Sequence, residues 1–122
     1  MSDITVDTTE QHGVMVVTIT GRLDHESVYD LEKELRRVID DDKYWIVVEL
    51  KDSYVGSSGL RLLLAMRKLV RSQCFGRSLR GDIRLVCTEL YARDTLALVG
   101  FNRIFQVHDT VEQAVKSFAG LA

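Results

Sequence analysis

Apolar residues recur along this chain with two periods, one typical of strands and one typical of helices. Short runs rich in β-branched residues predict strands, and stretches with apolar residues three or four positions apart predict helices between them. The predicted strands cover residues 4–7, 14–20, 45–50, 83–87 and 104–107. The predicted helices cover residues 26–40, 60–72 and 89–99, and a last helix follows Thr110. Strands separated by helices favour parallel crossovers, so the sequence predicts an α/β fold with helices packed on a mixed sheet.

The predicted strands differ in how they face the solvent. Residues 45–50 form a near-continuous apolar run, so we expect this strand at the centre of the sheet, covered on both faces. Residues 4–7 alternate between apolar and polar, as an edge strand with one exposed face does. We expect residues 21–24 to break the second strand, and a short turn to follow the 45–50 strand.

Capping residues mark the ends of the predicted helices. Asp24 or Ser27 caps the first helix, and Thr110 with Gln113 forms a capping box at the last one. Gly100 is placed to stop the third helix.

Length and composition fit one domain with its own core. The chain has 122 residues, of which 46% are hydrophobic. The longest apolar run, residues 62–66, is far too short to cross a bilayer, and the first residues lack the features of a signal peptide. We therefore expect a cytoplasmic protein. Two unclustered cysteines make neither a disulfide framework nor a zinc site, and we expect Cys87 to be buried and Cys74 exposed.

Positive charge is concentrated in one segment. Residues 61–84 hold seven basic residues and one acidic residue, Asp82, although the whole chain has a net charge of −2. Such an excess favours either the solvated side of a helix and a loop, or a docking face for an acidic partner. The candidate docking cluster combines basic residues of the second helix and the loop after it: Arg67, Lys68, Arg71, Arg77 and Arg80.

Ser57 and Ser58 lie between two glycines where a strand gives way to a helix. A serine at a helix N-terminus has its hydroxyl near unpaired N–H groups, so these serines either cap the helix or form a site that tolerates a phosphate. Catalysis is disfavoured, because the sequence holds no phosphate-binding glycine loop, no nucleophile elbow and no metal-ligand cluster. No recognition-helix pattern accompanies the basic stretch, which disfavours DNA binding.

Three motifs occur in order along the chain: Gly-Arg-Leu-Asp at 21–24, Ser-Ser-Gly-Leu at 57–60 and Leu-Ala-Leu-Val-Gly-Phe at 96–101. In this order they resemble the STAS family and, within it, the bacterial anti-sigma factor antagonists, and the resemblance covers almost the whole chain. The resemblance implies a single STAS domain over residues 1–122. It also implies a mixed sheet of four or five strands flanked by about four helices.

The resemblance implies a switch. Antagonists of this family bind a kinase-type anti-sigma factor, which phosphorylates a serine just before the glycine at the helix start, and a serine phosphatase reverses this. The matching serine is Ser58, with Ser57 as the second candidate. The implied partner-binding residues surround it: Asp24, Gly56, Ser57, Ser58, Gly59 and Arg61. We expect no enzyme activity, no cofactor, no metal and no direct contact with nucleic acid or membrane, and a weak homodimer is compatible with this function.

The chain departs from the family pattern at two places. Gly56 stands where many members have an aspartate, and the loop over residues 73–81 is longer than usual. Without that carboxylate, the alternative function is a non-phosphorylated STAS interaction subunit, such as a scaffold or a component of a transport system.

Overall fold

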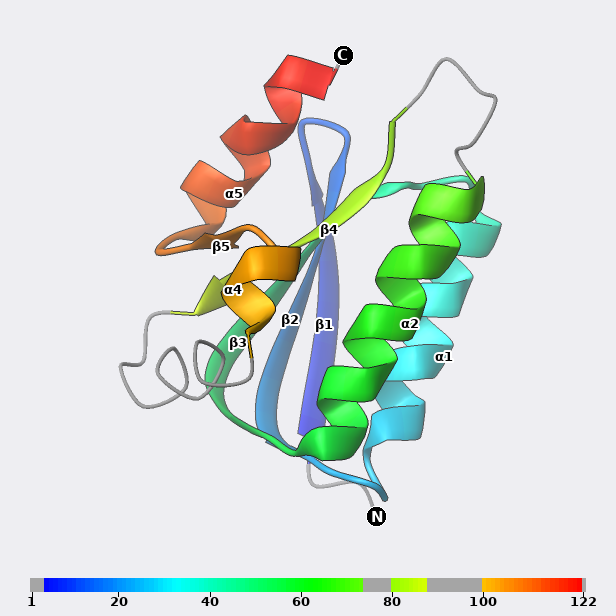
Figure 1. The fold of residues 1–122 in the computed structure, drawn as a ribbon, viewed down its shortest axis with the longest axis vertical. Helices are drawn as coiled ribbons and strands as arrows, with labels where there is room; N and C mark the ends of the chain where they lie inside the picture. Colours follow the sequence, from blue (N-terminus) through cyan, green and yellow to red (C-terminus); the bar gives the residue numbers. More distant parts are fainter. Residues whose placement is uncertain (1–3, 74–79, 88–99, 122) are drawn as a thin grey trace.

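A mixed sheet runs through the middle of the molecule (Figure 1). The computed structural model describes residues 4–73, 80–87 and 100–121, and within them the sheet has five strands in the order β1-β2-β3-β4-β5. The strands are β1 (Ile4–Gln11), β2 (Val14–Leu23), β3 (Trp45–Val55), β4 (Asp82–Cys87) and β5 (Val107–His108). β1 pairs with β2 antiparallel, and each later pair is parallel. The predicted mixed sheet is confirmed.

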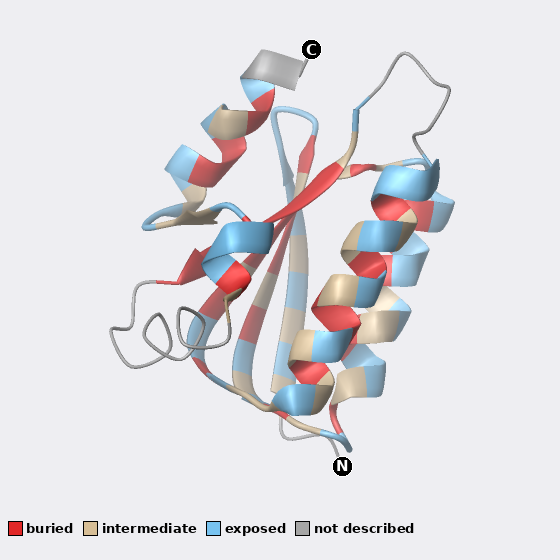
Figure 2. Cartoon of the chain, viewed as in Figure 1, coloured by how far each residue is buried: buried red, intermediate tan, exposed pale blue. Residues whose placement is uncertain are grey.

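Helices cover both faces of this sheet. They are α1 (Val28–Asp40), α2 (Ser57–Gln73), α4 (Phe101–Ile104), α5 (Val111–Ser117) and a 3-10 helix, η1 (Phe118–Leu121). α1 and α2 lie side by side over one face, and α5 lies over the other (Figure 1). The two parallel crossovers, β2-α1-β3 and β3-α2-β4, have the same handedness and run in the same direction across the sheet. They therefore place α1 and α2 on the same side of it. In Figure 2 the buried residues of α2, in red, alternate with exposed ones, as expected for an amphipathic helix.

Two apolar layers result, and β3 contributes to both. Ile46 and Val48 face the larger layer under α1 and α2, whereas Val47 faces the layer under α5, and all three are fully buried. β3 is therefore the central strand that its continuous apolar run predicts. Cys87 is buried in the larger layer, as expected.

Two predicted strand ends are wrong. β2 does not break at Gly21 but continues to Leu23. β3 does not turn after Leu50 but continues to Val55. The residues that suggested turns are instead accommodated inside paired strands, which extends both strands toward the start of α2.

A β-bulge explains how this pairing survives. Thr20 pairs with Lys51 and Gly21 with Ser53, so Asp52 is an extra residue in β3. Asp52 has a φ of 49°, in the left-handed region that aspartate tolerates better than most residues. The bulge accommodates Asp52 as an extra residue, and regular pairing of the two strands resumes after it.

The strand predicted over residues 104–107 is also wrong. The range is shifted: Ile104 ends α4, and a short strand, β5, does form but begins at Val107. Phe101 and Phe105 are both buried, and their rings stack with centroids 5.3 Å apart. Their spacing of four therefore reflects a short helical turn packed on the core.

The capping box at α5 is confirmed in a slightly shifted form. The Thr110 hydroxyl accepts a hydrogen bond from the Gln113 N–H at 3.1 Å. The Gln113 side chain accepts one from the Asp109 N–H at 3.3 Å, one residue before the expected donor. The predicted helix over residues 89–99, Cys74 and Arg77 lie outside the described residues.

A buried cluster of charges joins β4 to the helices on both faces. Asp82 accepts hydrogen bonds from Arg67 Nε of α2 at 3.0 Å and from Arg84 Nε at 3.3 Å. Arg84 also donates to the Ser117 hydroxyl at 2.7 Å, and its guanidinium carbon lies 4.3 Å from the centroid of the Phe118 ring. The cluster therefore ties α2 to the end of α5 through β4.

This cluster shows that part of the basic segment belongs neither to a solvated surface nor to a docking face. The Arg84 side chain is only 7% exposed and that of Arg67 is 22% exposed, so both contribute to interactions inside the fold. Arg61, Lys68 and Arg71 are the α2 cations that remain at the surface.

Replacing Asp82 with alanine should destabilise the fold strongly. The substitution leaves two arginines without their shared carboxylate, and breaking a buried ion pair on one side costs about 3–5 kcal/mol. Denaturant unfolding followed by circular dichroism measures the free energy of unfolding. Asp40→Ala, at an exposed acid of α1, is the control and should change it by less than about 0.5 kcal/mol. Equal effects of the two substitutions would contradict this role for the cluster.

Candidate functional site

The candidate site lies where the carboxyl ends of β2 and β3 meet the start of α2. Leu23 pairs with Val55, and the Gly56 N–H then donates to the Leu23 carbonyl at 2.8 Å. The Gly56 carbonyl in turn accepts from the Leu60 N–H at 3.1 Å, which begins α2. α2 thus starts at Ser57, earlier than predicted, and its first turn is fixed to the end of β2.

Asp24 is held in a tight turn between β2 and α1. Its Oδ1 accepts hydrogen bonds from the N–H groups of Glu26 at 3.0 Å and Ser27 at 3.1 Å. The Ser27 hydroxyl accepts from the Asp24 N–H at 2.9 Å and donates to the Arg22 carbonyl at 2.5 Å. Asp24 and Ser27 therefore stabilise the turn before α1 through reciprocal hydrogen bonds. Ser27 occupies the N-cap position of α1, but no side chain forms a cap hydrogen bond with the helix, so the predicted side-chain cap is not formed.

The same contacts set the ionisation of Asp24. Hydrogen bonds from the backbone N–H groups of Ser27 and then Glu26 hold the pKa of the Asp24 carboxyl below its ordinary value. The second oxygen, Oδ2, lies 3.5 Å from Arg22 Nε. Asp24 is therefore a fixed anion at neutral pH, beside the start of α2.

The two glycines of the motif play different parts. A Cβ on Gly59 would lie 2.7 and 2.9 Å from side-chain carbons of Leu23 and 3.1 Å from Val55, so the close packing of α2 on the strands requires a glycine. A Cβ on Gly56 would have no neighbour nearer than 3.5 Å, which is ordinary contact. Gly59 is buried, so any part it has in partner binding is to position the backbone.

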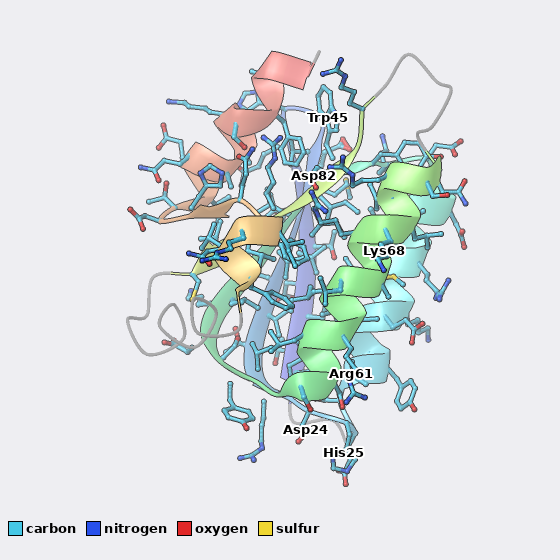
Figure 3. The ribbon with its side chains drawn as sticks, viewed as in Figure 1. Asp24, His25, Trp45, Arg61, Lys68 and Asp82 are labelled. Carbon is cyan, nitrogen blue, oxygen red and sulfur yellow. The ribbon has the colours of Figure 1, made fainter. Side chains whose placement is uncertain are left out.

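Ser57 and Ser58 are the first two residues of α2. Ser57 is exposed and Ser58 is half-buried. Within the described residues neither hydroxyl makes a hydrogen bond, and the N-terminal capping position is held by Gly56, which has no side chain. Simple capping therefore does not account for the serine pair. Arg61, one turn further along, is exposed and lies at the same end of the molecule as Asp24 and His25 (Figure 3).

Sequence reasoning missed the aromatic residues beside this motif. Tyr54 is 51% exposed, and the Arg22 guanidinium lies over its ring at 4.8 Å from the centroid. Tyr29, in the first turn of α1, is 68% exposed. One signal was available: Tyr29 is out of phase with the buried positions Leu31 and Leu35, which places an aromatic ring on the polar side of a helix.

The arrangement is suited to binding. Exposed aromatic rings and arginines are the side chains that most often anchor a protein interface. His25 is exposed, and its nearest ionic neighbour is Glu26 at 3.8 Å. Among the residues that the structure describes, no group of three side chains could hold a metal ion. No helix in the described ranges is both long and apolar enough to span a membrane.

Comparison with known proteins identifies the family. A family model for the STAS domain matches residues 5–114. The chain belongs to the STAS domain family. This STAS protein is 29% identical over 119 residues to the anti-sigma-F factor antagonist RsfB of Mycobacterium tuberculosis, covering 96% of this chain and 91% of RsfB. The family that the three motifs predicted is confirmed.

Solved STAS structures share the fold. A crystal structure of an anti-sigma factor antagonist from Mycobacterium paratuberculosis superposes with a TM-score of 0.79 at 24% identity, covering 93% of this chain and 92% of that one. The Bacillus cell fate determinant SpoIIAA in its phosphorylated form gives a TM-score of 0.67 at 17% identity, covering 93% and 98%. At these identities the similarity supports the fold alone.

Glycine substitutions should separate the two positions of this STAS motif. Gly59→Ala should lower the free energy of unfolding by about 1–3 kcal/mol, because the added methyl overpacks against Leu23. Gly56→Asp should leave it within about 0.5 kcal/mol of the wild type, because an added Cβ makes only ordinary contacts and aspartate is a favoured N-cap. Chemical denaturation of both variants tests this. Gly59→Ala as stable as the wild type would contradict the packing argument.

Asp24 should make stability depend on pH. Its carboxyl has a lower pKa in the folded chain than in the unfolded chain, so the unfolded chain binds more protons in acid. The resulting stabilisation is present above the ordinary aspartate pKa and is lost as pH falls through the lowered one. Carbon-13 NMR titration should find the pKa of the Asp24 carboxyl below the ordinary aspartate value of 3.8. The free energy of unfolding of the Asp24→Asn variant should depend less on pH in this range than that of the wild type. A pKa of the wild-type Asp24 carboxyl at its ordinary value would contradict this role of Asp24.

Proposed function

We propose that this STAS protein is an anti-sigma factor antagonist that binds a kinase-type anti-sigma factor and is released when Ser58 is phosphorylated. It acts by binding in the cytoplasm, where its partner controls transcription, and a serine phosphatase restores the binding form. Asp24, Gly56, Ser57, Ser58, Gly59 and Arg61 make or position the contact surface. Of these, Gly59 contributes through the backbone because it is buried.

One observation carries the proposal. A pair of serines without hydrogen-bond partners among the described residues opens α2, and two exposed tyrosines flank the same end of the fold. Tyr29 and Tyr54 are the most exposed large hydrophobic residues in the described chain. Aromatic rings that a monomer leaves exposed fit a surface that a partner covers.

The position suits an electrostatic switch. Transfer of the γ-phosphoryl group of ATP to the Ser58 hydroxyl adds a charge of about −1.5 to −2. The fold tolerates that charge, because the positive end of the α2 dipole faces it and the first turn of α2 has no acidic residue. A partner packed against the same turn must desolvate the phosphate or repel it, so the complex fails while the fold survives.

Gly56 bears on the alternative of a non-phosphorylated interaction subunit. A kinase that relies on the family aspartate for docking would act slowly on this chain. Gly56 adopts no conformation reserved for glycine, and its surroundings admit a Cβ. Gly56→Asp therefore tests the kinase contact without disturbing the fold, and faster phosphorylation of this variant would show that the missing carboxylate limits the wild type.

Ser58 should be the residue that controls binding. Each purified kinase-type anti-sigma factor of the source organism is mixed with the protein and ATP, and phosphate is located by peptide mapping. The cognate kinase should modify the wild type and Ser57→Ala but not Ser58→Ala. Biolayer interferometry should show that Ser58→Ala still binds. Ser58→Asp should weaken binding at least about tenfold, or roughly 1.4 kcal/mol.

The controls separate the alternatives. Phosphate on Ser57 alone would move the switch by one residue. Binding to an anti-sigma factor without any phosphorylation would favour the interaction subunit. If the wild type binds none of these anti-sigma factors, the proposed function is wrong.

A further inference from the structure

The outer side of α2 carries a line of positive charge that starts at the serine pair. Five exposed residues of α2 recur three or four positions apart, so they share one side of the helix. They are Ser57, Arg61, Ala65, Lys68 and Arg71. We call Arg61, Lys68 and Arg71 the basic strip, and Figure 3 labels two of its members along α2. At 1.5 Å per residue, the strip extends about 15 Å from the first turn of the helix.

The charges of the basic strip are not neutralised by neighbours. α2 contains no acidic residue. Elsewhere on the surface, cations pair with acids on their own helix: Arg36 with Glu32 at 3.0 Å and Lys116 with Glu112 at 3.0 Å. Within the described part of the chain, no member of the basic strip forms an ion pair. The basic strip therefore gives this side of α2 a positive electrostatic potential, although the whole chain has a net charge of −2.

The chemistry of the strip favours an acidic protein surface as its partner. Exposed apolar side chains that would insert into a membrane are missing from this side of α2, where Ala65 is the one exposed apolar residue. Three charges on an acidic chain are few for a nucleic acid, whose binding proteins commonly contact several phosphates. A partner seated on the serine pair would also cover the near end of the strip, because both belong to one helix face.

We propose that the basic strip docks an acidic surface of the anti-sigma factor and accelerates their encounter. This inference rests on the proposed function, since it assigns a second contact to the same partner. Complementary charges mainly raise the association rate, and salt screens them.

The strip also connects to the switch. Arg61 lies four residues after Ser57 and three after Ser58, the two spacings at which side chains on a helix meet. A phosphate on either serine therefore lies beside Arg61 and offsets its charge. Phosphorylation then weakens the strip where it joins the contact surface, so it slows encounter as well as blocking contact.

The test compares two variants that lose the same charge. Arg61→Gln/Lys68→Gln/Arg71→Gln removes the strip. Lys51→Gln/Arg103→Gln/Lys116→Gln is the matched control, which removes three exposed cations from β3, α4 and α5. Stopped-flow association with the anti-sigma factor that binds the wild type is measured at low salt and near molar salt. A short DNA duplex and vesicles containing phosphatidylglycerol serve as competing probes.

The strip variant should associate about tenfold more slowly at low salt, and this difference in association rate should be lost near molar salt, where screening acts over about 3 Å. The control should change association less than about twofold. An equal loss of association rate in both variants would mean that net charge causes the effect, and it would overturn the proposed role of the basic strip. Strip-dependent binding to the duplex or vesicles that exceeds binding to the anti-sigma factor would do the same. Absence of wild-type binding would instead reject the proposed function, and the strip with it.

Discussion

The hydrogen bond from the Gly56 N–H to the Leu23 carbonyl, at 2.8 Å, determines where the site forms. It extends the pairing of β2 and β3 by one residue and fixes the first turn of α2 against the end of β2. Gly59 completes this junction, because a Cβ there would lie 2.7 Å from Leu23. The bulge at Asp52 is what keeps the two strands in register long enough to reach it. The serine pair, Asp24 and Tyr54 all lie at this junction because the strands continue past the bulge.

α2 is anchored at two levels, which suits the proposed function, in which the surface changes its partner while the fold stays the same. The backbone junction holds its first turn, and the Arg67 contact to Asp82 holds its middle to β4. Asp82 is shared with Arg84, which reaches the end of α5. A charge added at the first turn therefore meets a helix that is already fixed. In the proposed function, phosphorylation acts on the interface, and the scaffold remains as it was.

The sequence predicted what depends on local pattern. The continuous apolar run of β3 indicated a central strand, and the Asp24 turn indicated a helix start, because both signals lie within a few residues. Pairing past the bulge was not predictable, since residues such as Gly21 and Asp52 favour turns locally and only a distant strand overrides them. The internal role of Arg84 depends on Asp82, Ser117 and Phe118, two of which are more than thirty residues away in the chain. Tyr54 was missed because its segment was interpreted as a turn.

In the proposed function, the serine pair at the start of α2 is a phosphorylation switch. Intact mass spectrometry of the protein isolated from its native host, before and after phosphatase treatment, tests it most directly. A switch at Ser58 should give a species heavier by one phosphate, which the phosphatase removes and which maps to the peptide that contains Ser58. A protein that stays unmodified through growth and stress, while it binds its anti-sigma factor throughout, would contradict the switch.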